Sequence, residues 1–276
     1  MIRKPAVAGT FYPSGANELA TVISEFVEKA KLDAASVSGA VSFVAPHAGY
    51  AYSGATAAYT FKAMLEARRK RKFDTIVIIG PNHTGYGQPI AVSLQDWETP
   101  FGVVRNDTEL SEAIIERSGY IREDEDAHSY EHSVEVELPF IQRLLGDVGC
   151  VFICMGDQSR EACILLDEAV RGAGKGLGRR IAVLASSDFD HYEPASVAKE
   201  KNMRAIRAIE KLDVEGFEDA LSKSGDSACG HGPVAVAALF ARSEGAKAGH
   251  LLKYTNSGEA TKEYGSVVAY ASIAFA

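Results

Sequence analysis

Four apolar runs of strand length constrain the fold of this chain more than any other sequence feature. None of the runs alternates apolar with polar residues, and they occupy residues 41–45, 75–79, 150–155 and 181–185. Uninterrupted apolar strands are typical of parallel sheets, in which helices cover both faces of every strand. The runs therefore predict a central sheet that is mostly parallel or mixed and is buried on both sides.

Segments with helical spacing of apolar residues lie between these runs, at 55–68, 134–145, 162–170 and 198–212. Strands that alternate with helices predict an α/β protein, here a single three-layer α/β/α domain over residues 1–276. Two further strands are expected at 251–255 and 267–274, and a hairpin insert within 89–107. The stretch GAGKGLG at 172–178 lacks the Ser or Thr of a phosphate loop and precedes a strand, so we predict a turn there.

The composition excludes several classes of protein. The chain of 276 residues is 46% hydrophobic and 24% charged, as globular proteins are. Its net charge of −8 argues against a nucleic-acid partner, because such proteins present a basic surface to phosphate. No apolar stretch approaches the roughly 18 residues of a membrane span, and the first residues lack the apolar core of a secretory signal. Four cysteines without a C-x-x-C pair do not make a disulfide framework, so we expect a cytoplasmic protein without membrane contact.

Polar side chains that suit catalysis or metal binding follow three of the four runs. His47 follows the first run, and His83 follows the second. The fourth run continues into SSDFDHY, which contains Asp188, Asp190 and His191. Ligands of open α/β sheets bind beyond the carboxyl ends of the strands. A lone histidine is more often structural, but three such positions at one sheet edge predict a shared site.

Two chemistries fit this set of side chains. Two neutral imidazoles and one carboxylate form the donor set that holds non-heme Fe(II) with open coordination positions. The same donors also bind Zn²⁺, which activates a water molecule. A further histidine that does not bind the metal can act as a general base, because its ordinary pKa lies close to neutral.

The segment HSYEH matches the inverted zinc-peptidase pattern H-x-x-E-H with His128 and His132. That pattern requires both histidines on one helical face, whereas the apolar periodicity begins only near Val134. Ser129 or Ser133 is better placed to cap the helix that follows. We therefore disfavour the peptidase interpretation and keep His132 as a candidate for substrate binding or proton handling.

Cys229 lies in the turn ACGHGP, just before an apolar helix. A thiol at a helix N-terminus is more easily ionised, because the free amides and the helix dipole stabilise the thiolate. A small buried residue at a turn explains the same pattern, so the residues alone leave both interpretations open. Cys150, Cys154 and Cys163 fall within an expected strand and helix and are expected in the core.

Six motifs together resemble the Memo-like family, also described as AmmeMemoRadiSam system protein B. They are GTFYPS, APHAGYAYSG, PNHTG, EHSVEVELPF, SSDFDHY and ACGHGP, and they occur in the order seen in the family. The resemblance extends from Ala8 to the last expected strand. It implies the fold of the class III extradiol dioxygenases, non-heme iron enzymes that cleave catechol rings, with a metal pocket at one edge of the sheet.

The resemblance also implies roles for single residues. It places His47, His83 and Cys229 at the metal-ligand positions and His191 at the position of the catalytic base. Asp188 and His132 fall at further pocket positions, where Asp188 would assist catalysis and His132 would contact the substrate. Fe(II) is the implied cofactor, and a small-molecule or peptide ligand is the implied partner.

Cys229 departs from the dioxygenases, which keep a glutamate at this position. A thiolate is softer than a carboxylate, prefers Cu(I) or Zn²⁺, and is itself open to oxidation. Three functions follow from the resemblance and this departure. The first is dioxygenase-like oxidoreductase activity. The second is non-catalytic binding of a peptide or metabolite in the same cleft, as described for animal relatives. The third is zinc-dependent hydrolysis.

Overall fold

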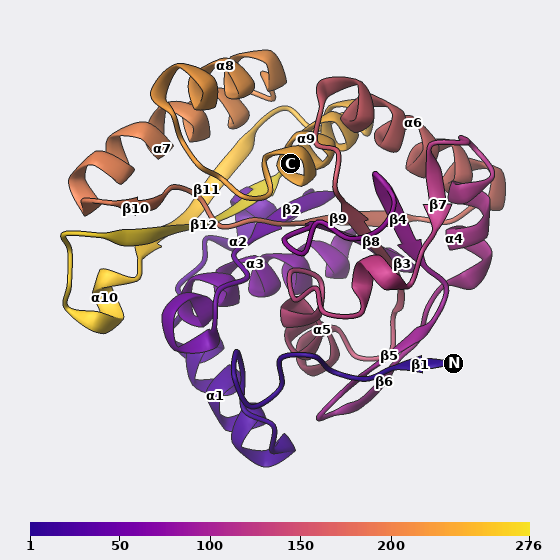
Figure 1. Cartoon of the computed structure of the whole chain (residues 1–276), viewed down its shortest axis with the longest axis horizontal. Coiled ribbons are helices and arrows are strands. Elements are labelled where there is room, and N and C mark those ends of the chain that lie inside the picture. Colours follow the sequence, from indigo (N-terminus) through magenta and orange to yellow (C-terminus); the bar gives the residue numbers. More distant parts are fainter.

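A mixed nine-stranded sheet forms the centre of the molecule (Figure 1). The computed structural model describes residues 1–276. The middle of the sheet is parallel, and its strands lie in the order β2 (Ser42–Ala45), β9 (Ile181–Ser186), β3 (Thr75–Pro81) and β8 (Gly149–Met155). These are the four apolar runs, and every residue of β2, β3 and β9 is buried. The predicted parallel core is therefore confirmed.

Further strands extend the sheet on both sides, and the first on each side is antiparallel to its neighbour in the parallel core. Beyond β2 lie β12 (Val267–Phe275), β11 (Gly249–Asn256) and β10 (His191–Glu193), and beyond β8 lie β4 (Ile90–Ser93) and β7 (Ile121–Glu123). A separate three-stranded sheet contains β1 (Ile2–Arg3), β5 (Asp96–Thr99) and β6 (Gly102–Val104). The expected final strands and the expected hairpin are both present, the latter as β5–β6.

Helices cover both faces of the sheet and complete the three layers (Figure 1). One face carries α1 (Ala16–Lys29), α2 (Ala34–Val37), α3 (Tyr50–Lys70) and α5 (Leu138–Leu145). The other carries α4 (Thr108–Ile115), α6 (Arg160–Leu177), α7 (Ala195–Ile209), α8 (Val214–Ser224) and α9 (His231–Ser243), while the short α10 (Gly258–Thr261) lies near the margin. None of these helices has both the length and the apolar character needed to cross a membrane.

The core is divided by the sheet into two apolar clusters, because successive side chains of a strand point to opposite faces. Along β3, Val77 and Ile79 belong to one cluster, whereas Ile76 and Ile78 belong to the other. Each strand of the parallel core is thereby buried on both sides, which explains why its sequence does not alternate.

Two local predictions are wrong. The stretch 172–178 is not a turn, because α6 continues to Leu177 and ends only at Gly178 in the left-handed conformation, with φ 64°. A Cβ at Gly174 would lie 2.4 Å from Ile181 Cδ1, so the small residues let α6 lie close to the start of β9. The helix expected from residue 134 begins at Leu138, after the 3-10 turn Glu135–Glu137.

Candidate metal centre

Three neighbouring strands of the parallel core deliver polar residues to one edge of the sheet. His47 lies two residues beyond the end of β2, His83 two residues beyond β3, and Asp188 two residues beyond β9. Since β9 lies between β2 and β3, the three chain segments meet. The imidazole rings of His47 and His83 are 5.1 Å apart, edge to face. The structure thus brings these predicted site residues together.

Cys229 reaches the same edge from the turn before α9. Its sulfur lies 3.3 Å from Nε2 of His47 and accepts a hydrogen bond of 3.3 Å from the backbone N–H of Asp188. The close approach depends on the next residue, because a Cβ at Gly230 would lie 2.4 Å from the carbonyl oxygen of Ser186. The ligand atoms of His47, His83 and Cys229 all lie within 4.8 Å of one another.

These three side chains fit a single metal ion. An ion bonded to an imidazole nitrogen at about 2.0 Å and a thiolate at about 2.3 Å holds the two atoms roughly 3.5 Å apart in tetrahedral geometry. The observed 3.3 Å between His47 Nε2 and Cys229 Sγ is close to that separation. Burial raises the pKa of the Cys229 thiol, and a bound cation would favour the thiolate that coordination requires.

His47 is prepared to donate a lone pair from Nε2. Burial lowers the pKa of His47 well below its usual range, and the neighbouring His132 and His83 lower it further, so the ring is neutral at pH 7. Its Nδ1 lies 2.8 Å from the hydroxyl of Ser186, and its backbone N–H donates to Oδ1 of Asp188 at 2.9 Å. The ring is therefore held from the side opposite Cys229.

Glu131 organises the other two histidines of the cluster. Its carboxylate accepts hydrogen bonds from the backbone N–H and Nδ1 of His83, at 2.5 and 2.9 Å, and from the backbone N–H groups of His132 and Ser133. Burial opposes ionisation of this carboxyl, but the hydrogen bonds from His83 and the Ser133 backbone hold the pKa of Glu131 below its usual range. Glu131 is not among the residues that the sequence predicts.

His132 lies against the cluster but outside the group of three ligand atoms. Its ring stacks on that of His83 at 4.6 Å and meets that of His47 edge to face at 5.4 Å. Its ligand atom also lies within 4.8 Å of those of His83 and Glu131. Burial lowers the pKa of His132, so its imidazole is neutral at pH 7.

Asp188 lies just beyond the end of β9, and His191 is the first residue of β10. Burial raises the pKa of Asp188 to about 7, against the hydrogen bonds that it accepts from the backbone N–H groups of His47 and Ala48. Burial lowers the pKa of His191, and its backbone N–H donates to Ser227 Oγ at 2.8 Å. Neither residue contributes an atom to the group of three ligands.

The structure contradicts the peptidase pattern HSYEH. His128 ends a 3-10 turn, Asp126–His128, and His132 lies beyond it outside any helix, so the two residues share no helical face. The His128 ring is fully buried and lies 5.4 Å from the ring of Trp97. The expected cap is also wrong, since Ser133 Oγ donates to the carbonyl oxygen of Pro81.

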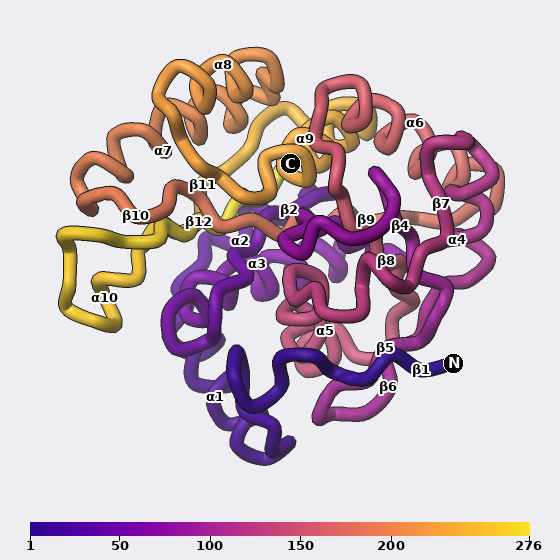
Figure 2. The backbone as a smooth tube through the Cα atoms, in the orientation of Figure 1, coloured from indigo at the N-terminus to yellow at the C-terminus, as the bar shows by residue number.

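The N-terminal segment fixes the position of this loop. In Figure 2 it runs beside β5, with which β1 pairs in parallel. The Arg3 guanidinium donates to the carbonyl oxygens of His128 and Glu131, at 2.8 and 2.7 Å, and forms a buried ion pair of 2.6 Å with Glu135. It also lies 3.9 Å above the ring of Trp97. The loop that carries Glu131 and His132 is therefore held from outside the site.

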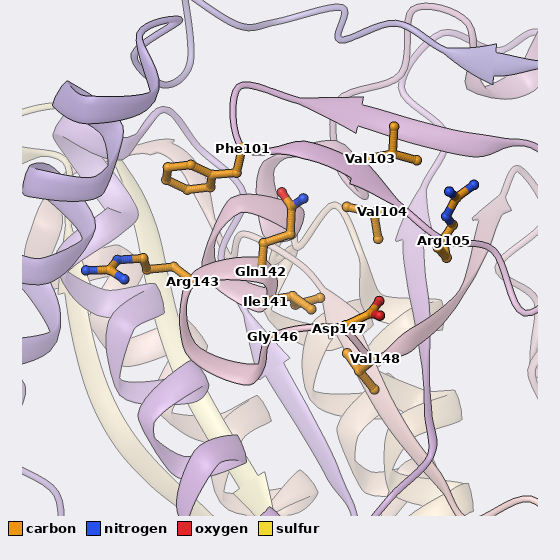
Figure 3. A pocket seen from close by; sticks show the side chains of 10 residues that line it. All are labelled: Phe101, Val103, Val104, Arg105, Ile141, Gln142, Arg143, Gly146, Asp147 and Val148. Carbon is orange, nitrogen blue, oxygen red and sulfur yellow. The ribbon is translucent and has the colours of Figure 1, made fainter.

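A surface cavity of about 560 Å³ lies away from the histidines, between the β5–β6 hairpin and α5 (Figure 3). Apolar side chains such as Phe101 and Ile141 line it together with Arg105 and Asp147. It contains no histidine or cysteine, and none of the predicted site residues reaches it. The clustered side chains at the sheet edge are therefore the candidate functional site.

Comparisons with known proteins show what the chain as a whole is similar to. The family model described as "Memo-like protein" matches residues 3–274. A MEMO1 family protein of Methanosarcina barkeri is 40% identical over 273 residues, which cover 99% of this chain and 99% of that protein. A second from Ignicoccus hospitalis is 40% identical over 284 residues, with 100% and 99% coverage, and a third from Archaeoglobus fulgidus is 39% identical over 274 residues, with 99% of each chain covered. Their names state a family and no reaction.

Proposed function

The chain belongs to the Memo-like protein family, and from that premise we propose that it is a non-heme metalloprotein with dioxygenase-like oxidoreductase chemistry. One observation carries the proposal: the ligand atoms of His47, His83 and Cys229 lie within 4.8 Å of one another, although they come from distant parts of the chain. A buried neutral imidazole and a thiol side by side are donors suited to iron, copper or zinc. Fe(II) is the cofactor that we propose first, and Cu or Zn²⁺ are the alternatives.

Each residue around the ligands has a distinct role in this proposal. An iron or copper ion held by His47, His83 and Cys229 would supply redox chemistry. His191, which is neutral at pH 7, would accept a phenolic proton as general base. Asp188 holds the backbone of the first ligand through His47 N–H, and His132 presents its ring to a substrate that enters beside His83.

The metal content of the protein tests the proposal. The protein is purified anaerobically without a metal-binding tag, and its bound metals are measured by elemental analysis before and after loading with Fe(II), Cu(I), Zn²⁺ or Co²⁺. We expect about one ion per chain, and with Co²⁺ a thiolate-to-metal absorption band from Cys229. Absence of stoichiometric binding under every condition would reject the metal centre. Retention of zinc alone, with hydrolytic activity in the absence of oxygen, would favour a hydrolase instead.

A second function, binding of a peptide or metabolite without catalysis, is favoured by exposed tyrosines next to the site. Tyr130 and Tyr192 are 79% and 78% exposed and lie within two residues of His132 and His191 in the sequence. Tyr192 also adopts a left-handed backbone conformation, with φ 66°, which costs a bulky residue energy and is common at functional sites. A ligand affinity that chelators leave unchanged would support this function over the first.

Substitution of Glu131 by glutamine is expected to weaken metal binding about 10- to 100-fold. The glutamine amide has one acceptor oxygen, whereas the Glu131 carboxylate accepts from four N–H groups, so at least one N–H of His83 or His132 would face an N–H₂ group. Co²⁺ titration monitored by absorbance measures the change. Glu116→Gln, at an exposed position, is the matched control and should bind as the wild type does. Equal affinity of the Glu131 variant and the wild type would contradict the prediction.

A further inference from the structure

The hydroxyl of Ser186 connects His47 to a second buried glutamate of the same loop. Ser186 Oγ lies 2.8 Å from Nδ1 of His47, 2.7 Å from the carbonyl oxygen of Ser133 and 2.8 Å from Oε1 of Glu137. All four residues are buried. A hydroxyl has one proton to donate and two lone pairs that accept, so three partners at hydrogen-bond distance fill its capacity.

The positions of the protons follow from what each partner can do. The Ser133 carbonyl can only accept, so it takes the single Ser186 proton; otherwise two oxygen lone pairs would face each other at 2.7 Å. The two remaining partners of Ser186 must then donate. His47 donates from Nδ1, and Glu137 can donate only as a protonated carboxylic acid.

The surroundings of Glu137 agree with a neutral carboxyl group. Its side chain makes no ion pair, and its Oε2 is buried without a hydrogen-bond partner. Glu135, two residues earlier, differs because its buried charge is compensated. Its carboxylate accepts hydrogen bonds from the Arg3 guanidinium, the hydroxyl of Tyr12 and two backbone N–H groups. Burial raises the pKa of Glu137 well above its usual range, against the hydrogen bond with Ser186, and the nearby Asp188 raises it further.

We infer that Glu137 is a positioning residue, held as a neutral acid that donates to Ser186 Oγ and so leaves the Ser186 proton to the Ser133 carbonyl, an arrangement in which His47 carries its proton on Nδ1. With one Ser186 lone pair filled by Glu137 and its proton on Ser133, the hydroxyl can only accept from His47. Nε2 is then unprotonated and faces the sulfur of Cys229. The consequence for metal affinity rests on the proposed function, whereas the tautomer and the protonated carboxyl do not.

Two variants separate this role from a general structural one. Glu137→Gln is uncharged and can donate an amide N–H to Ser186, so we expect the His47 tautomer and the metal affinity to stay as in the wild type. Glu137→Met fills a similar volume without a donor, so one lone pair of the Ser186 hydroxyl is left unfilled, and the hydroxyl, although still directed at the Ser133 carbonyl, holds His47 Nδ1 less firmly. We expect His47 to keep its proton on Nδ1 in the metal-free protein and the affinity for Co²⁺ to fall by about 10-fold, because the ring is held less firmly.

The measurements are nitrogen-15 NMR of the His47 ring, infrared spectroscopy and Co²⁺ titration. The wild type should show His47 protonated at Nδ1, and an infrared band of a protonated carboxyl group that disappears in Glu137→Gln. Glu116→Met, at an exposed position, should leave all three readouts unchanged. The infrared test needs only the glutamine variant, so it stands if Glu137→Met does not fold.

Each outcome bears on one proposal at a time. If the wild type binds no metal but shows the Nδ1 tautomer and the carboxyl band, the proposed metal centre fails and the inference about Glu137 stands. If metal binds but His47 carries its proton on Nε2, or no carboxyl band is lost in Glu137→Gln, the inference is overturned. Equal Co²⁺ affinities of Glu137→Met and the wild type would also overturn it.

Discussion

Replacement of His47 or His83 by alanine is expected to abolish stoichiometric metal binding and to leave the fold intact. Each variant removes one of the three donors whose atoms lie within 4.8 Å of one another, and two protein ligands hold an ion far less firmly than three. Elemental analysis of the two variants, purified anaerobically beside the wild type, measures the ion content per chain. Circular dichroism and urea unfolding report whether the fold is kept.

The two variants should differ in stability even though both lose the ion. The His83 side chain is 34% exposed, and its removal should change the free energy of unfolding by about 1 kcal/mol. His47 is buried, and its removal leaves the Ser186 hydroxyl without one partner, so we expect a loss of about 1 to 3 kcal/mol. His250→Ala, in β11 and outside the cluster, is the control and should keep its metal. Full metal occupancy in both site variants would remove these histidines from the ligand set.

The positions of His47 and His83 could be predicted because the signal for them is local. A strand buried on both faces is an uninterrupted apolar run, and the first polar residues beyond it mark the edge where ligands bind. β2, β3 and β9 obey this rule. Cys229 could not be placed in the same way, since it reaches the site from a turn whose approach depends on the absence of a side chain at Gly230.

The buried glutamates could not be assigned because their partners are distant in sequence. Glu135 and Glu137 lie among aliphatic residues in a segment with helical spacing, and this mixture is the one local signal that they are buried. Glu131 precedes that segment, in a polar stretch that carries no such signal. The separate roles of the three glutamates depend on His83, on Arg3 and on Ser186, which lie 48, 132 and 49 residues away. No periodicity in the segment itself distinguishes a carboxylate that orients a ligand from one that anchors the N-terminus.

Short motifs gave wrong predictions in two segments whose conformation is determined by tertiary contacts. The glycines of 172–178 predict a turn locally, yet α6 continues through them because a small residue at Gly174 allows close packing against Ile181. HSYEH matches a zinc-binding pattern in letters, but its two histidines do not share a helix. In both segments the decisive contacts come from other elements of the fold.

Arg3 lies outside the site and holds the loop that carries part of it. Its guanidinium is 6% exposed and pairs with the fully buried carboxylate of Glu135. It also donates to the carbonyl oxygens of His128 and Glu131 and lies over Trp97. These contacts join the first residues of the chain to the loop that presents Glu131 to His83.

Arg3→Ala is accordingly expected to lower the free energy of unfolding by about 3 kcal/mol, measured by urea unfolding. Loss of one partner of a buried ion pair costs about 3 to 5 kcal/mol. The lower end applies here, since Glu135 keeps hydrogen bonds from Tyr12 and two backbone N–H groups. Arg105→Ala, which breaks an exposed ion pair with Asp96, should cost at most about 1 kcal/mol. Equal losses in the two variants would mean that the Arg3 contacts stabilise the loop no more than a surface pair does, and that the loop holds Glu131 in place without its N-terminal anchor.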